Sequence, residues 1–121
     1  ELAYLYSQAY AAGELKHGPI ALIDEKILVI GIATQKNTLE KTLSNLKECK
    51  ARNGKILTIT SKLSNTIENI SDDIFMIPET HEIFTPILVN IVLQLFAYYV
   101  ANGLGCEIDK PRNLAKSVTV E

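Results

Sequence analysis

The sequence predicts an α/β fold, a three-layer αβα sandwich around a parallel sheet, and three observations lead to this class. Residues 26–33 (KILVIGIA) form a continuous apolar run, typical of a central strand covered on both faces. A helical pattern and then a second strand, residues 55–60 (KILTIT), follow it, so the three elements make a βαβ unit. Residues 86–102 are apolar nearly all round, and we expect a buried helix between layers.

The helix of the βαβ unit has start and stop signals. Asn37 can cap it and Glu40 can reach back to the cap, a capping-box arrangement, and Gly54 supplies the stop. Its apolar face holds Leu39, Leu43 and Leu46. We expect residues 61–72 to be a polar connection and residues 73–78 (DIFMIP) to be a third short strand.

The two ends of the chain predict further helices. Residues 1–13 suit an amphipathic helix that ends before Gly18-Pro19, because proline disfavours helical geometry in the residue before it. Thr85 would cap the last helix, with Pro86 at its first position. Because the chain begins as if inside a helix and only three strands are predicted, we expect the native protein to continue upstream.

Composition narrows the classes of function. The 121 residues are 47% hydrophobic and 21% charged, the balance of a soluble globular protein. A net charge of −2 gives no broad basic field, so we expect neither nucleic acid nor an anionic membrane as a partner. We take the charge-free core of the last helix as too short for a bilayer, which needs about 20 apolar residues, and Asn90 and Gln94 interrupt it. Cys49 and Cys106 are isolated and fit a reducing, cytoplasmic setting.

His17 lies in residues 13–19 (GELKHGP), just before the Gly-Pro pair that stops a helix. The dipole and the free carbonyls at a helix C-terminus favour positive side chains, so Lys16 and His17 can both be caps. The functional interpretation is a histidine at a loop edge that accepts and returns a proton near neutral pH. The local residues leave both interpretations open.

The C-terminal segment, residues 112–121 (RNLAKSVTVE), also has two interpretations. Chain ends usually fray, but the apolar residues of this segment are able to dock, and Lys116 would then be held against protein. A lysine with a pKa near 10.4 is only about 0.1% neutral at pH 7.4, so a nucleophilic lysine needs burial or a neighbouring cation to lower its pKa. Arg112 is the candidate cation.

Three other polar features of the sequence are weaker candidates for a functional site. The strand-to-helix turn at residues 33–38 could offer backbone N–H groups to a phosphate, but it has no glycine and fits a capped helix start better. The hydroxyl-bearing residues between positions 58 and 66 fit loop structure in the same way. His81 is interpreted as a surface or helix-entry residue.

Two motifs together point to a known family. Residues 9–23 (AYAAGELKHGPIALI) and residues 110–121 (KPRNLAKSVTVE) resemble the glucosamine-6-phosphate synthases, which are glutamine–fructose-6-phosphate aminotransferases (isomerizing). The helical region PILVNIVLQLFAYYVA between them is also similar to that family. The resemblance covers essentially the whole chain, but only the C-terminal part of such an enzyme.

The resemblance implies a Rossmann-like sugar isomerase (SIS) fold. Residues 1–109 would be the second SIS domain without its first strand, and residues 110–121 would be an active-site tail. The enzyme would convert fructose 6-phosphate and ammonia to glucosamine 6-phosphate, for amino-sugar biosynthesis. The ammonia would come from an N-terminal glutaminase domain outside this chain. We expect no cofactor and no metal, and a fragment that is inactive alone.

The resemblance also implies roles for four residues. Glu1 matches the glutamate that moves a proton between the first two sugar carbons. His17 matches the histidine that opens the sugar ring, and in a homodimer it would reach the active site of the neighbouring subunit. Lys116 matches the lysine that forms a Schiff base with the open-chain ketose, and Ala115 lies where the tail backbone contacts the sugar.

Two other functions stay open. A non-catalytic SIS domain could bind a sugar phosphate as a sensor, and a phosphosugar deglycase or isomerase would share the fold. We expect the motif RNLAKSVTVE in neither of these alternatives, so the terminal lysine motif favours the synthase.

Overall fold

The computed structural model describes residues 1–115, which belong to two compact units. The sheet unit is Ala9–Val89, and the terminal unit joins Glu1–Gln8 to the chain from Asn90 onward. Helix α3 (Thr85–Gly103) begins in the sheet unit and continues into the terminal unit.

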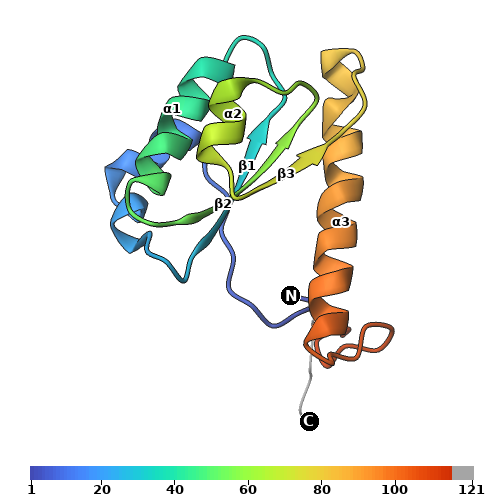
Figure 1. Cartoon of the computed structure of the whole chain (residues 1–121). Coiled ribbons are helices and arrows are strands. Elements are labelled where there is room, and N and C mark those ends of the chain that lie inside the picture. Colours follow the sequence, from blue (N-terminus) through green and yellow to red (C-terminus); the bar gives the residue numbers. More distant parts are fainter. Residues whose placement is uncertain (116–121) are drawn as a thin grey trace. The chain divides into compact units, whose positions relative to one another are not determined.

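A three-stranded parallel sheet forms the centre of the sheet unit. Its strands are β1 (Leu28–Ala33), β2 (Lys55–Thr60) and β3 (Asp73–Met76), and they lie in the order β1-β2-β3. Helices α1 (Leu39–Lys50) and α2 (Asn65–Ile70) cover one face of the sheet (Figure 1). The predicted α/β class with a parallel sheet is confirmed.

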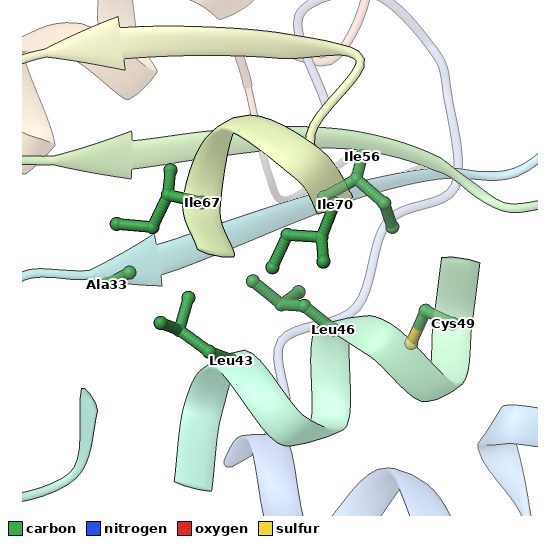
Figure 2. Packing of buried hydrophobic residues seen from close by; sticks show 7 residues of the cluster. All are labelled: Ala33, Leu43, Leu46, Cys49, Ile56, Ile67 and Ile70. Carbon is green, nitrogen blue, oxygen red and sulfur yellow. The ribbon is translucent and has the colours of Figure 1, made fainter. Parts of the chain in front are cut away.

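The core of the sheet unit lies between the sheet and these two helices. Figure 2 shows side chains from α1 and α2 directed toward those of the strands. The buried cluster consists of Ala33, Leu43, Leu46, Cys49, Ile56, Ile67 and Ile70. The helix approaches β1 closely at Gly31, where an added Cβ would lie 2.5 Å from Cδ1 of Leu46. The leucine spacing in the sequence therefore predicted the correct face of α1.

The opposite face of the sheet is covered only in part. The register places Ile32, Ile59 and Phe75 in one row across the three strands. Ile59 at the centre is fully buried, whereas Ile32 is 46% exposed and Phe75 is 45% exposed. The third layer of the expected sandwich would pack against these outer positions.

The predicted helix over residues 1–13 is wrong. Residues 4–11 have no regular secondary structure, and the 3-10 helix η1 (Ala12–His17) begins only at Ala12. Most of the first eleven residues are exposed, so they lack the tertiary packing from which a short helix gains its stability. The stop is confirmed, because Gly18 separates η1 from a second 3-10 helix, η2 (Pro19–Leu22).

The start and stop of α1 differ from the prediction. The helix begins at Leu39, and its cap residue Thr38 has helical backbone angles and makes no side-chain cap bond. Asn37 therefore does not fill the capping role. At the other end Asn53 takes the left-handed conformation (φ 66°), while Gly54 is needed for space, because a Cβ there would lie 2.7 Å from a methyl carbon of Ile23.

Helix α2 lies where the sequence predicted a polar connection. The Ser64 side chain accepts a hydrogen bond from the Ile67 N–H and caps the helix, and Ile67 and Ile70 are buried. Six residues are too few to show a clear helical period, which is why the pattern was missed.

The predicted cap at Thr85 is also wrong. The 3-10 helix η3 (Glu82–Phe84) precedes α3 directly, and Thr85 has helical backbone angles and donates through Oγ1 to the Glu82 carbonyl at 2.8 Å. His81 is the cap, since its Nδ1 accepts the Ile83 N–H at 3.4 Å. The interpretation of His81 as a helix-entry residue is confirmed.

Helix α3 is largely exposed rather than buried as expected. Ile91 and Leu95 are each 49% exposed, and Tyr99 is 65% exposed. The segment Glu82–Gly103 has 22 residues and contains a stretch of 18 with a mean hydropathy of 1.8, so by length and composition it could cross a membrane. The expectation that this helix is too short for a bilayer is therefore wrong. Core helices of soluble proteins pass the same test, so the finding is weak evidence for a membrane.

Candidate functional site

The terminal unit brings Glu1 and the C-terminal tail to one hollow. The hollow has a volume of about 260 Å³. Its lining residues are Glu1, Leu2, Pro111, Asn113 and Leu114. Glu1 and Asn113 are the polar residues of this lining, and the other three residues are apolar. Two parts that the sequence analysis assigned to one site, Glu1 and the segment just before Lys116, are neighbours in the structure.

Tyr4 contacts the same tail through two interactions. The guanidinium carbon of Arg112 lies 4.2 Å from the centroid of the Tyr4 ring, and the Arg112 backbone N–H donates to the Tyr4 hydroxyl at 3.1 Å. The sequence suggests Arg112 as a cation beside Lys116, and it gives no signal that Tyr4 contacts the tail. The two residues are 108 positions apart, and no spacing rule pairs residues at that separation.

The tail is described as far as Ala115, which is exposed. The Leu114 N–H donates to the Pro111 carbonyl at 2.9 Å, so the segment makes a turn just before this point. Lys116, the predicted Schiff-base lysine, lies outside the described residues.

His17 is the last residue of η1 in the sheet unit. Leu15 packs against the core, and Nζ of Lys16 lies 3.6 Å from Oε1 of Glu48 on α1. These contacts fix the loop and leave the His17 side chain exposed. Gly18 follows at φ 141°, a conformation that side-chain-bearing residues rarely adopt. Both the cap and the catalytic interpretation of His17 fit this geometry.

The strand-to-helix turn at residues 33–38 does not form an anion site. The Lys36 backbone N–H donates to a carboxylate oxygen of Glu82 at 3.1 Å, so an internal acid uses the group that a phosphate would need. Thr60 donates its hydroxyl to the carbonyl at the end of β1 at 2.9 Å, and Thr58 shares a 2.7 Å hydrogen bond with Ser71. These hydroxyls bond within the fold, but Thr58 and Thr60 are buried in β2 and do not belong to a loop as predicted.

Within residues 1–115 no cluster of three or more His, Cys, Asp or Glu side chains is arranged to hold a metal ion. Cys49 and Cys106 are free thiols, and burial raises the pKa of the Cys49 thiol above its usual value. A buried neutral thiol of this kind acts as a small apolar side chain in the core.

Comparison with known proteins identifies the class to which this α/β chain belongs. Residues 1–102 match the SIS domain, so the chain is a member of the SIS domain family. Over all 121 residues it is 50% identical to a glutamine–fructose-6-phosphate aminotransferase [isomerizing] of Caldanaerobacter subterraneus and 51% identical to one of Clostridium tetani. The chain spans 20% of the length of these curated relatives.

A solved structure agrees with this assignment. The C-terminal domain of glucosamine-fructose-6-phosphate aminotransferase from Francisella tularensis superposes with a TM-score of 0.78 at 32% sequence identity. The match covers 90% of this chain and 31% of that one. The fold is therefore shared well beyond the motifs at the two ends.

Proposed function

We propose that this chain is the sugar-converting, C-terminal part of a glutamine–fructose-6-phosphate aminotransferase, which makes glucosamine 6-phosphate from fructose 6-phosphate and ammonia. The observation that carries the proposal is the roughly 50% identity to enzymes of that name along the entire chain, both ends included. The hollow that joins Glu1 to the tail supports it, because the proposed chemistry needs those two parts together.

The proposed reaction begins with ring opening, for which His17 would exchange a proton with the sugar oxygens. The Lys116 amine then adds to C2 of the open-chain ketose and water leaves, which gives a protonated imine, a better electrophile than the ketone. Ammonia adds to C2 and the lysine leaves. Glu1 finally moves a proton from C1 to C2, so that C1 becomes the aldehyde and C2 carries the amine. One water is released overall, and no oxidant or reductant is consumed.

The proposed imine needs protection from water. A tail that closes over the sugar would exclude water from the imine, which would otherwise hydrolyse. Glu1 and apolar residues of the tail border the same hollow of about 260 Å³, so the proposed acid–base group lies beside the tail.

The proposed partners follow from the relatives. The chain covers only a fifth of their length, so a glutaminase domain that supplies ammonia would belong to the remainder of the protein. We further propose a homodimer in the cytoplasm, without nucleic acid, membrane, metal or cofactor. In that assembly protein rather than lipid would cover the apolar surface of α3.

Borohydride trapping tests the proposal directly. The full-length protein is incubated with fructose 6-phosphate and borohydride without glutamine, and the labelled peptide is mapped by mass spectrometry. We expect a reduced sugar adduct on Lys116, lost in Lys116→Arg and kept in the matched control Lys110→Arg. Sugar binding without an adduct would overturn the proposal and favour a non-catalytic SIS sensor.

Mixed dimers test the assignment of His17. A His17→Ala protein and a Lys116→Ala protein would each be inactive, and mixing them should restore part of the activity if His17 serves the neighbouring subunit. At random exchange, half of the dimers are mixed and each has one intact site, so about a quarter of the wild-type activity is expected. No recovery, with subunit exchange demonstrated, would contradict donation across subunits.

A further inference from the structure

Tyr4 connects the residue proposed for proton transfer to the tail proposed for imine formation. Its backbone N–H donates to the Glu1 carbonyl at 3.2 Å, so Glu1 and Tyr4 close one turn. Its side chain points to the tail and makes both contacts with Arg112. All these residues belong to the terminal unit.

The two contacts on Arg112 constrain different parts of that residue. The cation–π contact holds the guanidinium over the ring, and the hydrogen bond from the backbone N–H fixes the main chain. Together they orient the tail as well as hold it, four residues before Lys116. A single exposed contact would leave the chain free to rotate about it.

The backbone of Tyr4 supports a specific placement of this ring. Tyr4 has a φ of 55°, in the left-handed region that bulky residues seldom occupy. Tyr6, two residues later, is 90% exposed, and its hydroxyl donates to the side chain of Gln8 at 2.7 Å. The two tyrosines thus have different surroundings within one short segment, and Tyr4 is the one on the tail.

We propose that Tyr4 is a positioning residue for the C-terminal tail: it docks Arg112 and so holds the described stem of the tail, residues 111–115, beside Glu1. This inference rests on the proposed function. Docking the stem orients the tail before the reaction, and such pre-orientation acts on the rate of imine formation more than on sugar affinity.

The test measures the rate of borohydride-trapped imine at Lys116, with kcat and KM for fructose 6-phosphate, in the full-length protein. Tyr4→Leu removes both contacts and should slow trapping about tenfold, the combined worth of an exposed cation–π contact and one hydrogen bond. Arg112→Ala keeps the backbone N–H and removes only the cation–π contact, so it should slow trapping about threefold. The double variant should be no slower than Tyr4→Leu alone, because Tyr4→Leu already removes both contacts. KM should stay within about twofold.

Conservative variants separate positioning from a role in folding. Tyr4→Phe keeps the ring and loses the hydroxyl, and Arg112→Lys keeps a cation, so both should retain a larger share of the trapping rate. Tyr6→Leu is the matched control and should trap at the wild-type rate. The inference would be overturned if the losses in trapping rate of the two single variants multiplied in the double variant. It would also be overturned if Tyr6→Leu lost as much of the trapping rate as Tyr4→Leu.

The two proposals fail in different ways. If the wild-type protein gives no adduct on Lys116, the proposed function is wrong. If the wild-type protein traps the sugar and Tyr4→Leu does so at the same rate, the proposed function stands and the positioning role of Tyr4 is wrong.

Discussion

The sheet unit and the terminal unit expose their apolar residues to different degrees. In the sheet unit Cys49, Ile56 and Ile67 are at most 1% exposed, because α1 and α2 lie against the sheet. In the terminal unit Ile91 and Leu95 on α3 are each 49% exposed, although α3 is the more apolar helix. An apolar pattern thus predicts which residues favour burial, but it does not predict which surface will cover them.

The two units also hold the proposed site residues by different means. The loop that ends at His17 rests on packed protein, through Leu15 in the core and Lys16 on α1. The tail is held through polar and aromatic contacts of Arg112 with Tyr4. The loop at His17 therefore rests on core packing, whereas the stem of the tail is docked by exposed contacts of modest strength.

The largest expected effect is the difference in the free energy of unfolding when one isoleucine in each unit is shortened to alanine. Ile56→Ala removes a fully buried side chain and should lower the free energy of unfolding by about 2–5 kcal/mol. Ile91→Ala removes a half-exposed one and should cost less than about 1.5 kcal/mol. Urea unfolding followed by circular dichroism measures both. Equal losses would contradict the contrast and show that α3 is covered in the whole protein.

The next effect tests how closely α1 approaches the sheet. Gly31→Ala places a methyl group 2.5 Å from Leu46 and should destabilise the sheet unit by about 1–3 kcal/mol. Leu46→Val in the same protein should recover part of the loss, because it removes some of the overlap. Gly13→Ala is the matched control, with no atom within 4 Å of the added carbon, and its thermal midpoint should change little.

A smaller effect concerns the helix that the sequence analysis missed. Ser64→Ala removes the side-chain acceptor for the Ile67 N–H and should cost about 1 kcal/mol. Ser44→Ala, at an exposed position inside α1, should be neutral or slightly stabilising, since alanine has the higher helix propensity. An unchanged urea midpoint in Ser64→Ala would mean that the cap contributes nothing to α2.

The sequence predicted those features that depend on neighbouring residues. The strand at residues 55–60 and the apolar face of α1 were correct because each is set by a local period. The helix over residues 1–13 failed because its stability depended on a packing surface that the sequence does not specify. Asn37 failed as a cap because the helix begins at Leu39 with Thr38 in the cap position, one residue later than predicted, and helix ends are uncertain at that scale.

The same distinction between local and long-range features applies to the candidate site. Sequence motifs named Glu1, His17 and Lys116, and the structure adds that Glu1 and the tail border one hollow. Tyr4 could not be found from the sequence, because its contact with Arg112 joins residues 108 positions apart. Long-range contacts of this kind arise only once the backbone has brought two segments together.

The smallest effect is a pH dependence confined to the sheet unit. The hydrogen bond from Lys50 Nζ, at 2.6 Å, and the bond from the Ile56 backbone N–H, at 2.8 Å, lower the pKa of Asp72 below its usual value. Because the folded-state pKa is the lower one, the stabilising contribution is present above the unfolded pKa of about 3.9 and is lost as pH falls through the folded pKa. Asp72 is partly exposed, so salt should weaken the effect.

Replacement of Asp72 by asparagine separates this contribution from general acid destabilisation. Urea midpoints of the wild type should fall more steeply below about pH 4 than those of Asp72→Asn, and the two curves should converge in strong acid. Parallel curves would mean that Asp72 does not contribute. The contact between Arg112 and Tyr4 contains no carboxylate, so the same acid range should weaken the link between α1 and the sheet and leave the docked tail in place.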